Sequence, residues 1–192
     1  MATKALITPE QYFATQFERE PELVRGELVE RPLPTFPHGN IQLRMGSRLM
    51  ALQQSYPVFT GVEVRVRMAP DLYRIPDISM WEGAAPDSLP ATPPLLVVEI
   101  SSPDDRLDAM LQKLEEYRVW GVPHIWLIEP ELERIHVYDG GSLTAVARLE
   151  LPAVRLRGSR GRIIHLSAAQ GRSDGFGIGV RQGAGNFAGA VV

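Results

Sequence analysis

Two periodicities of apolar and polar positions divide the chain into predicted helices and strands. Residues 38–56 carry apolar side chains at helical spacing, which predicts a helix with one buried face. That face consists of Ile41, Met45, Leu49 and Leu52. Residues 58–68 end in a strict alternation of apolar and charged positions, which predicts a half-buried strand. A turn at residues 69–74 predicts that this strand pairs antiparallel with residues 75–83.

Capping and helix-breaking residues mark two further helices. Thr8 is a predicted N-cap, because Pro9 suits the first helical position and Gln11 completes a capping box. The other helix is predicted to begin at residues 103–104 and to be stopped by the glycine and proline within residues 121–123.

The remaining apolar segments predict strands. Two continuous apolar runs, residues 95–101 and 124–129, are typical of buried strands. Residues 134–139 alternate and are followed by two glycines, which predicts a hairpin with residues 143–151. The resulting order of elements indicates an α/β (α+β) fold, a single domain with a mixed central β-sheet flanked by helices.

Composition and charge narrow the class of protein. The 192 residues, 44% hydrophobic and 22% charged, are typical of one globular domain. No stretch approaches the roughly 20 apolar residues of a membrane span. The N-terminus lacks the apolar region of a signal peptide, and without cysteine there is no disulfide or thiolate metal site. We therefore expect a cytoplasmic protein with no membrane partner.

The C-terminal part of the chain differs in charge and composition. From residue 155 onward it holds six arginines and one acid, so this segment carries +5 and the rest carries −8. Such asymmetry is typical either of a basic arm for nucleic acid or of a solubilising tail. Beyond residue 166 the sequence is glycine-rich and aperiodic. We therefore predict a domain at residues 1–166 and a glycine-rich tail of weak or borrowed order at residues 167–192.

Two carboxylates lie on neighbouring predicted strands. Glu99 ends the most apolar strand, where an unpaired charge is costly, and Asp77 begins the strand before it. Mg²⁺ needs only one or two carboxylates, with water and substrate phosphate as its other ligands. Asp77 and Glu99 are therefore candidate metal ligands. Each acid alone is also typical of a structural role, as an ion-pair partner or a turn cap.

A lysine lies on the predicted helix that follows Glu99. A helical wheel gives this helix one apolar arc, made of Leu107, Met110, Leu111, Leu114, Tyr117 and Trp120. Lys113 falls inside the edge of that arc. Taken alone it is typical of a snorkelling side chain, but beside Glu99 it would relieve the buried charge and meet an anion. The four histidines show no zinc-site spacing, and no phosphate-binding glycine motif occurs.

Five motifs in this order resemble one known family. They are PDISMWEG, LLVVEISSPDD, KLEEY, GVPHIWLIEP and IHVYDGG, and the resemblance extends over residues 8–155. They look like the Uma-two family of restriction endonucleases, a branch of the PD-(D/E)XK nuclease superfamily. The resemblance implies a restriction-endonuclease-like core.

The resemblance also implies roles for particular residues. It implies Asp77 and Glu99 as metal ligands and catalytic residues. Ser101 stands where the superfamily commonly has a lysine, two residues after Glu99, so this chain departs from the common pattern. The basic role in this family looks to have moved to the following helix, which implies Lys113. The family's GEL.E strand matches Glu27 and Glu30, and one of these two acids, with Glu30 favoured over Glu27, is a further candidate metal ligand.

Four residues are candidates for substrate binding. His38 matches a family histidine that comes before the long N-terminal helix. Its role is either that of a residue at the start of the helix or that of a phosphate contact. Arg65 and Arg67 form a basic strand face, which is either a solvated face or a DNA contact. Ser101 completes this group.

The implied activity is metal-dependent hydrolysis of DNA phosphodiester bonds by an endonuclease. Asp77, Glu99 and the carbonyl of Ile100 would hold one or two Mg²⁺, for which Mn²⁺ is the natural substitute. Lys113 would orient water or stabilise the transition state. Duplex cleavage would call for a homodimer, because two strands need two sites.

Two other functions stay open. One is a nuclease-like fold that binds nucleic acid or a partner without cleavage, which Ser101 and the acidic main body favour. The other is a structural oligomer assembled through the glycine-rich tail. Retention of Asp77, Glu99 and Lys113 argues against a module without metal, since such a module would gain from losing buried charge.

Overall fold

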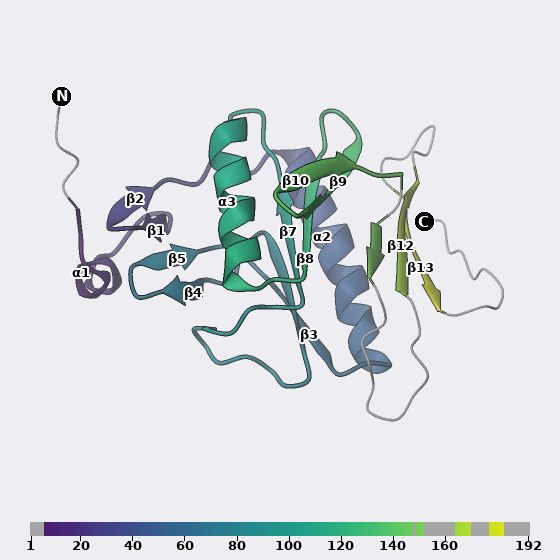
Figure 1. Cartoon of the computed structure of the whole chain (residues 1–192), viewed down its shortest axis with the longest axis horizontal. Coiled ribbons are helices and arrows are strands. Elements are labelled where there is room, and N and C mark those ends of the chain that lie inside the picture. The colour runs from purple at the N-terminus through teal and green to yellow at the C-terminus, as the bar shows by residue number, and fades with distance from the viewer. Residues whose placement is uncertain (1–5, 148, 152–163, 170–176, 183–192) are drawn as a thin grey trace.

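The structure is a computed structural model that describes residues 6–147, 149–151, 164–169 and 177–182 (Figure 1). Its helices are α1 (Pro9–Ala14), α2 (Phe36–Ala51), the 3-10 helix η1 (Leu52–Gln54) and α3 (Leu107–Trp120). Its strands are β1 (Glu22–Val24), β2 (Glu27–Val29), β3 (Val58–Val62), β4 (Val66–Ala69), β5 (Leu72–Arg74), β6 (Ile78–Glu82), β7 (Leu96–Ile100), β8 (His124–Glu129), β9 (Arg134–Asp139), β10 (Ser142–Ala145), β11 (Leu149–Leu151), β12 (Ile164–Ala169) and β13 (Gly177–Gln182).

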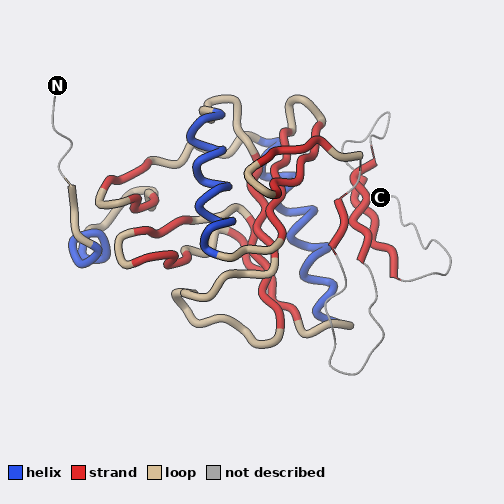
Figure 2. The backbone as a smooth tube through the Cα atoms, viewed as in Figure 1, coloured by secondary structure: helices blue, strands red, loops and turns tan. Residues whose placement is uncertain are grey.

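A six-stranded sheet forms the centre of the molecule. Its strand order is β10-β9-β8-β7-β6-β3. Only β7 and β8 pair in parallel within this sheet, and α3 is the crossover that connects them. Figure 2 shows helices on both sides of these strands. The predicted mixed sheet flanked by helices is confirmed.

The two faces of this sheet are covered by different helices. On one face, α2 packs Met45 and Leu49 against alternate residues of β7, among them Leu96 and Val98. On the other face, α3 packs Leu114 and Tyr117 against Val97 and the neighbouring residues of β8. Strand alternation along β7 therefore places Glu99 on the α3 side, together with Val97.

A second, four-stranded sheet has the order β2-β1-β5-β4. Its first hairpin turns at Arg25 and Gly26, which both have positive φ, 54° and 85°. This geometry is that of the tight turns that join antiparallel strands, and glycine accepts it without steric cost. The hairpin brings β1, which the sequence pattern did not predict, next to β5.

The prediction of one continuous strand over residues 58–68 was wrong. The segment splits into β3, which pairs with β6, and β4, which pairs with β5. The chain bends between them, with φ of 49° at Glu63. A Cβ at Gly61 would lie 2.5 Å from Cγ2 of Val64, so only glycine permits this close approach.

The predicted helices are present, but their bounds differ: α2 begins at Phe36 and ends at Ala51, where a helix over residues 38–56 was predicted. Both hydrogen bonds of the capping box between Thr8 and Gln11 are present at the start of α1. The predicted apolar face of α2 is buried. In contrast, α3 begins at Leu107 and not at residues 103–104, because Asp105 accepts a hydrogen bond from the Ser102 amide and closes a turn there. Leu107 is consequently 63% exposed, outside the core to which the wheel assigned it.

The last described strands form a three-stranded sheet, β11-β12-β13. β12 runs across the predicted boundary at residue 166, and β13 lies in the segment predicted to be aperiodic. The division into domain and tail stays a prediction. The arginines at 155, 157, 160, 162 and 172, on which the predicted basic arm depends, lie outside the described residues.

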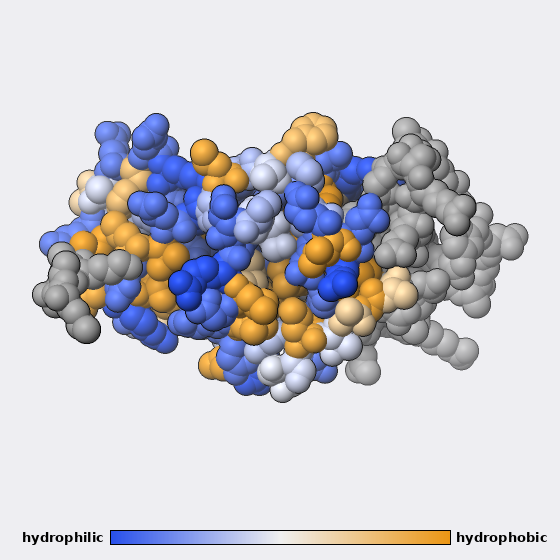
Figure 3. Space-filling model, turned by 90° about the horizontal axis from the view of Figure 1, so that it is seen from above, coloured by the Kyte–Doolittle hydropathy of each residue, from blue (hydrophilic) through white to orange (hydrophobic). Residues whose placement is uncertain are grey.

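The surface mixes polar and apolar side chains. Large apolar residues that are exposed include Leu33, at 79%, and Phe36, at 83%. On the face shown in Figure 3, hydrophobic patches alternate with hydrophilic ones. Scattered apolar exposure of this kind is ordinary for a folded protein. Of the helices that the structure describes, none is long and apolar enough to span a membrane.

Candidate active site

Asp77 and Glu99 meet on the α3 side of the six-stranded sheet. The register between β6 and β7 pairs Ile78 with Val98, and one further step places Asp77 opposite Glu99. Residues opposite each other in an antiparallel pair project to the same side. Asp77 Oδ2 accepts a 2.7 Å hydrogen bond from the Ile100 amide. Both side chains belong to residues that are at most 7% exposed.

Glu99 is held by two residues of α3. Tyr117 Oη donates a 2.7 Å hydrogen bond to Oε1, and Lys113 Nζ lies 2.9 Å from Oε1 and 3.0 Å from Oε2. Burial raises the pKa of Glu99 to about 7; the Lys113 charge opposes this, and the charges of Asp77 and Glu22 add to it. Glu99 is therefore a carboxyl whose protonation is balanced near neutral pH.

Lys113 lies between two carboxylates. Its Nζ is 3.0 Å from Glu22 Oε1 in addition to the contacts with Glu99. Burial alone would lower the pKa of Lys113, but the negative charges of Glu22, Glu99 and Asp77 outweigh burial and raise it above its ordinary value. The side chain thus remains a cation in its partly buried position.

The second sheet contributes Glu22 from β1 and Arg74 from β5. Arg74 Nη1 donates a 2.7 Å hydrogen bond to Glu22 Oε2, and the Ile75 amide donates one of 2.8 Å to Oε1. Arg74 also lies 2.7 Å from Glu116 on α3. Burial would raise the pKa of Glu22, but Lys113 and Arg74 together lower it. Glu22 is therefore a buried, charged carboxylate.

Sequence reasoning missed Glu22 and Arg74. The signal for Glu22 is the repeat in residues 22–29, where the letters ELV occur on both sides of Arg-Gly. Two strand-like triplets around a tight-turn dipeptide predict a hairpin. No comparable signal exists for Arg74, because its environment depends on the pairing of β1 with β5.

His38 approaches Asp77 from the first turn of α2. Its Nε2 is 3.3 Å from Asp77 Oδ1, and its amide donates to the N-cap Thr35. Burial would lower the pKa of His38, but the hydrogen bond and charge of Asp77, with smaller contributions from Glu99 and Asp105, raise it. Asp77 is thus flanked by a histidine as well as by the Ile100 amide.

The other predicted site residues differ in whether they line the cavity that contains Asp77 and Glu99. Glu30 is exposed and lines the same cavity as Asp77 and Glu99. Ser101 lies next to the site but is not among the residues that line the cavity, and its hydroxyl donates a 3.3 Å hydrogen bond to the Ile128 carbonyl.

Arg65 and Arg67 do not line the cavity. Arg65 pairs with Glu20 and lies 4.5 Å from the centre of the Phe13 ring, so it has contacts within the fold. Arg67 is exposed on β4. A role of either arginine in binding DNA stays a prediction.

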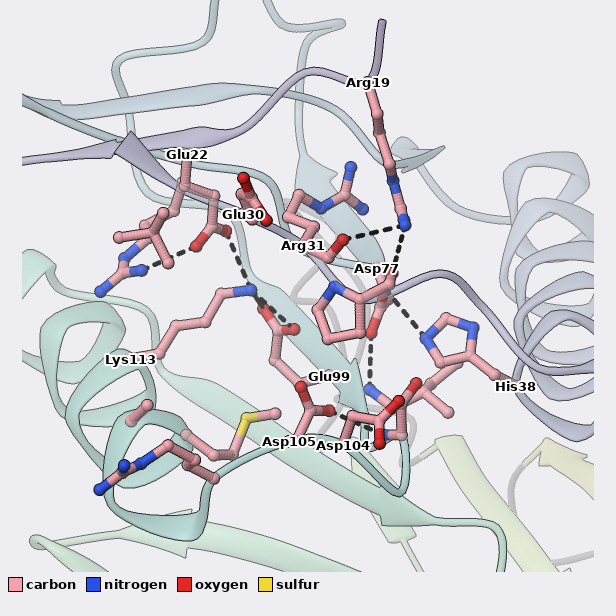
Figure 4. Close-up of a pocket in the computed structure, with 18 residues that line it drawn as sticks. Arg19, Glu22, Glu30, Arg31, His38, Asp77, Glu99, Asp104, Asp105 and Lys113 are labelled. Carbon is pink, nitrogen blue, oxygen red and sulfur yellow. Dashed lines mark hydrogen bonds and ion pairs between the residues drawn. The ribbon is translucent and has the colours of Figure 1, made fainter. Parts of the chain in front are cut away.

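The converging groups line a cavity of about 230 Å³ (Figure 4). Its walls come from β1, β2 and the chain after β2, from the start of α2, from β7 and from the start of α3. The ionisable residues that line it are Arg19, Glu22, Glu30, Arg31, His38, Arg74, Asp77, Glu99, Asp104, Asp105, Arg106 and Lys113. Figure 4 shows Lys113 extending between Glu22 and Glu99. The cavity therefore has acids at its floor and offers both signs of charge to a ligand.

The donor set suits a hard divalent cation such as Mg²⁺. Asp77 and Glu99 are close enough for the charge of Asp77 to raise the pKa of Glu99, and a cation between them would remove this repulsion. Among the described residues, no three acid or histidine side chains form a ready-made metal cluster. Mg²⁺ does not need such a cluster, because water and phosphate complete its ligands. Asp77 and Glu99 thus fit a magnesium site.

The fold resembles that of one solved structure. A crystal structure described as "a putative nuclease belonging to DUF820", from Anabaena variabilis ATCC 29413, has a TM-score of 0.65 and 21% identity, and the match covers 76% of this chain and 88% of that one. At this identity the likeness shows a shared fold. A cryo-EM structure of a DrdV–DNA complex matches with a TM-score of 0.37 and 15% identity, over 55% of this chain and 9% of that chain, which is too weak to carry an argument. No curated protein matches the chain.

The chain therefore shares its fold with a structure described as a putative nuclease. Residues 9–160 match the family described as "Uma2: Putative restriction endonuclease". Because this match spans most of the chain, the protein belongs to the Uma2 (Uma-two) family. The resemblance inferred from the sequence motifs is confirmed.

Proposed function

We propose that the protein is a Mg²⁺-dependent endonuclease that hydrolyses phosphodiester bonds in DNA. The observation that carries the proposal is the convergence of Asp77, Glu99 and Lys113 at the floor of one cavity, within 3.0 Å for the Lys113–Glu99 pair. Two buried acids and an amine that line one cavity form an arrangement suited to phosphoryl chemistry. Membership of a nuclease family supports the same class of reaction.

Asp77 and Glu99 are the proposed ligands of the cation, with the Ile100 carbonyl beside them. When bound, Mg²⁺ would supply a nucleophilic water of lowered pKa and neutralise charge on the phosphate. The hydrogen bond from the Ile100 amide to Asp77 Oδ2 and that from Tyr117 to Glu99 Oε1 fix the orientation of the two carboxylates. Hydrogen bonds of this kind orient metal-binding carboxylates.

Lys113 is proposed to stabilise the transition state. Its pKa is raised by the surrounding acids, so it stays protonated and is unsuited to act as a general base. An ammonium beside the two ligands can instead attract the non-bridging oxygens of a phosphate as their charge increases. His38, next to Asp77, is proposed to contact the phosphate from the α2 side.

A cleavage assay with Asp77→Ala tests this proposal. Plasmid, single-stranded and branched DNA are incubated with the wild type in Mg²⁺, in Mn²⁺ and in chelator. We expect cleavage only with metal, and a loss of about 100-fold or more in the variant. Asp71→Ala is the matched control, because Asp71 pairs with Arg25 on an exposed turn and lies outside the cavity.

Equal cleavage by the wild type and Asp77→Ala would refute the assignment. Salt-dependent DNA binding without any cleavage in either metal would support the alternative, a nuclease-fold module that only binds nucleic acid. If duplex DNA is cut in both strands, a homodimer is the expected active form, because each strand needs its own site. Sedimentation of the protein with and without DNA measures that state.

A further inference from the structure

Glu22 is a buried acid to which the proposed reaction assigns no role. It comes from β1 of the four-stranded sheet and is 3% exposed. Its Oε1 accepts from the Ile75 amide at 2.8 Å and contacts Lys113 Nζ at 3.0 Å, while Oε2 accepts from Arg74 at 2.7 Å. Two cations, Lys113 at Oε1 and Arg74 at Oε2, thus already balance the charge of Glu22, so this acid has less to gain from a metal ion than Glu99 has.

Lys113 is the group that Glu22 shares with Glu99. Its ammonium contacts one carboxylate on each side, at 3.0 Å for Glu22 and 2.9 Å for Glu99 (Figure 4). Glu99 is also the proposed ligand of Mg²⁺, and a carboxylate that turns to a cation gives up part of its contact with an ammonium. Glu22 is fixed by Arg74 and by the Ile75 amide, and it is not a proposed ligand of the cation.

We propose that Glu22 is a positioning residue that holds the Lys113 ammonium at the cavity while Glu99 coordinates the cation. The proposal rests on the function proposed above. Without Glu22, Lys113 keeps Glu99 as its one carboxylate partner within ion-pair distance among the described contacts. Lys113 then competes with the cation for Glu99 and no longer points at the phosphate.

Arg74 compensates the charge of the buried Glu22. It binds Glu22 through Nη1 and Glu116 through Nη2, each at 2.7 Å. Glu22 therefore has two cations beside it, Lys113 and Arg74, and its charge is balanced even when Lys113 turns toward substrate. This double pairing gives Glu22 a fixed orientation that a single contact with a flexible lysine could not provide.

The chain offers a matched pair of substitutions. Glu22→Gln and Glu116→Gln each remove one carboxylate from Arg74, but only the first removes a carboxylate from Lys113. Each variant is measured for Mn²⁺ affinity by calorimetry, for kcat and KM on DNA, and for thermal unfolding. For Glu22→Gln we expect kcat to fall about 10- to 100-fold and Mn²⁺ to bind up to about 10-fold more weakly, with KM unchanged. Glu116→Gln is expected to match the wild type in kcat and in Mn²⁺ affinity.

A second variant guards against misfolding. Glu22→Gln combined with Arg74→Met removes both members of the buried Glu22–Arg74 pair, and buried pairs replaced together are tolerated better than broken ones. Glu116 keeps its hydrogen bond from Gln112 in this variant. The double variant is expected to show the same fall in kcat as Glu22→Gln.

The outcomes separate this inference from the function on which it rests. If Glu22→Gln and Glu116→Gln behave alike, the positioning role is wrong while the nuclease proposal stands. If Glu22→Gln abolishes Mn²⁺ binding as Asp77→Ala does, Glu22 is a ligand and the positioning role is again wrong. If the wild type itself neither binds Mn²⁺ nor cleaves DNA, both proposals are overturned.

Discussion

The two faces of the six-stranded sheet are built from the same strands but carry different chemistry. Toward α2, β7 presents Leu96, Val98 and Ile100 to an apolar core. Toward α3, the same strand presents Val97 to an apolar cluster and Glu99 to Lys113 and Tyr117. One face buries an apolar cluster, and the other places charged side chains at the edge of its apolar cluster.

The difference shows how one strand can serve stability and chemistry at once. Strand alternation separates the two roles by side, so a carboxylate on the α3 face does not disturb the packing on the α2 face. The buried charges are paired with one another, which keeps their desolvation from unfolding the chain. Substitutions on the α2 face should therefore affect stability, and those at Glu99 and its partners should affect metal binding and pH dependence.

The largest expected effect is loss of stability from the α2 face. Leu49 is fully buried on α2, and Leu49→Ala should lower the free energy of unfolding by about 2–5 kcal/mol because it leaves a cavity. Denaturant unfolding measures this change. Leu43→Ala, on the same helix but 70% exposed, is the control and should change stability little. Equal effects of the two substitutions would contradict the assignment of the core.

A smaller effect on the free energy of unfolding is expected when pH changes the protonation of Glu99 on the α3 face. Because the pKa of Glu99 is about 7 in the folded chain against an ordinary 4.5, the folded chain binds this proton more tightly. Its contribution to stability is present below pH 4.5 and is lost as the pH rises through 7. The loss is about 3 kcal/mol by the standard conversion.

Unfolding of the wild type and Glu99→Gln at several pH values measures this contribution. Glutamine does not titrate, so the wild type should lose stability relative to the variant between pH 4.5 and pH 8. Parallel stability curves for the two proteins over that range would show that the fold does not raise the pKa of Glu99.

The smallest expected effect tests a single hydroxyl. Tyr117→Phe removes the 2.7 Å hydrogen bond to Glu99 Oε1 and leaves the ring in place. We expect Mn²⁺ to bind about 10-fold more weakly, because the ligand loses its orientation. Tyr138→Phe is the control, since Tyr138 donates a similar bond to Glu115 away from the cavity. Unchanged affinity in Tyr117→Phe would mean that Lys113 alone orients Glu99.

Much of the fold follows from periodicity. The apolar face of α2, the capping box of α1 and the buried strands β7 and β8 depend on short-range patterns, and these patterns are visible in the sequence. The break between β3 and β4 was not predicted, because it depends on a close approach of Gly61 to Val64 within an alternating stretch. Periodicity cannot detect a bend that leaves the alternation intact.

The candidate site was predictable only in part. Asp77, Glu99 and Lys113 lie on consecutive elements, so strand alternation and a helical wheel suffice to bring them together. Glu22 reaches Lys113 through a different sheet, from a segment far earlier in the chain. Contacts between distant segments leave no periodic trace, which is why Glu22 and Arg74 emerged only from the structure.

The ion pairs that join β1 and β5 to α3 have one further consequence. Lys113 and Glu22 have side chains that are 13% and 3% exposed, whereas the pair Arg106–Asp108 is 80% and 69% exposed. Mobile ions screen charges that water reaches and hardly affect those that it does not. Added salt should therefore weaken the exposed Arg106–Asp108 pair. The ion pairs between the four-stranded sheet and α3 should be unchanged. The architecture of the site should thus be preserved at high salt.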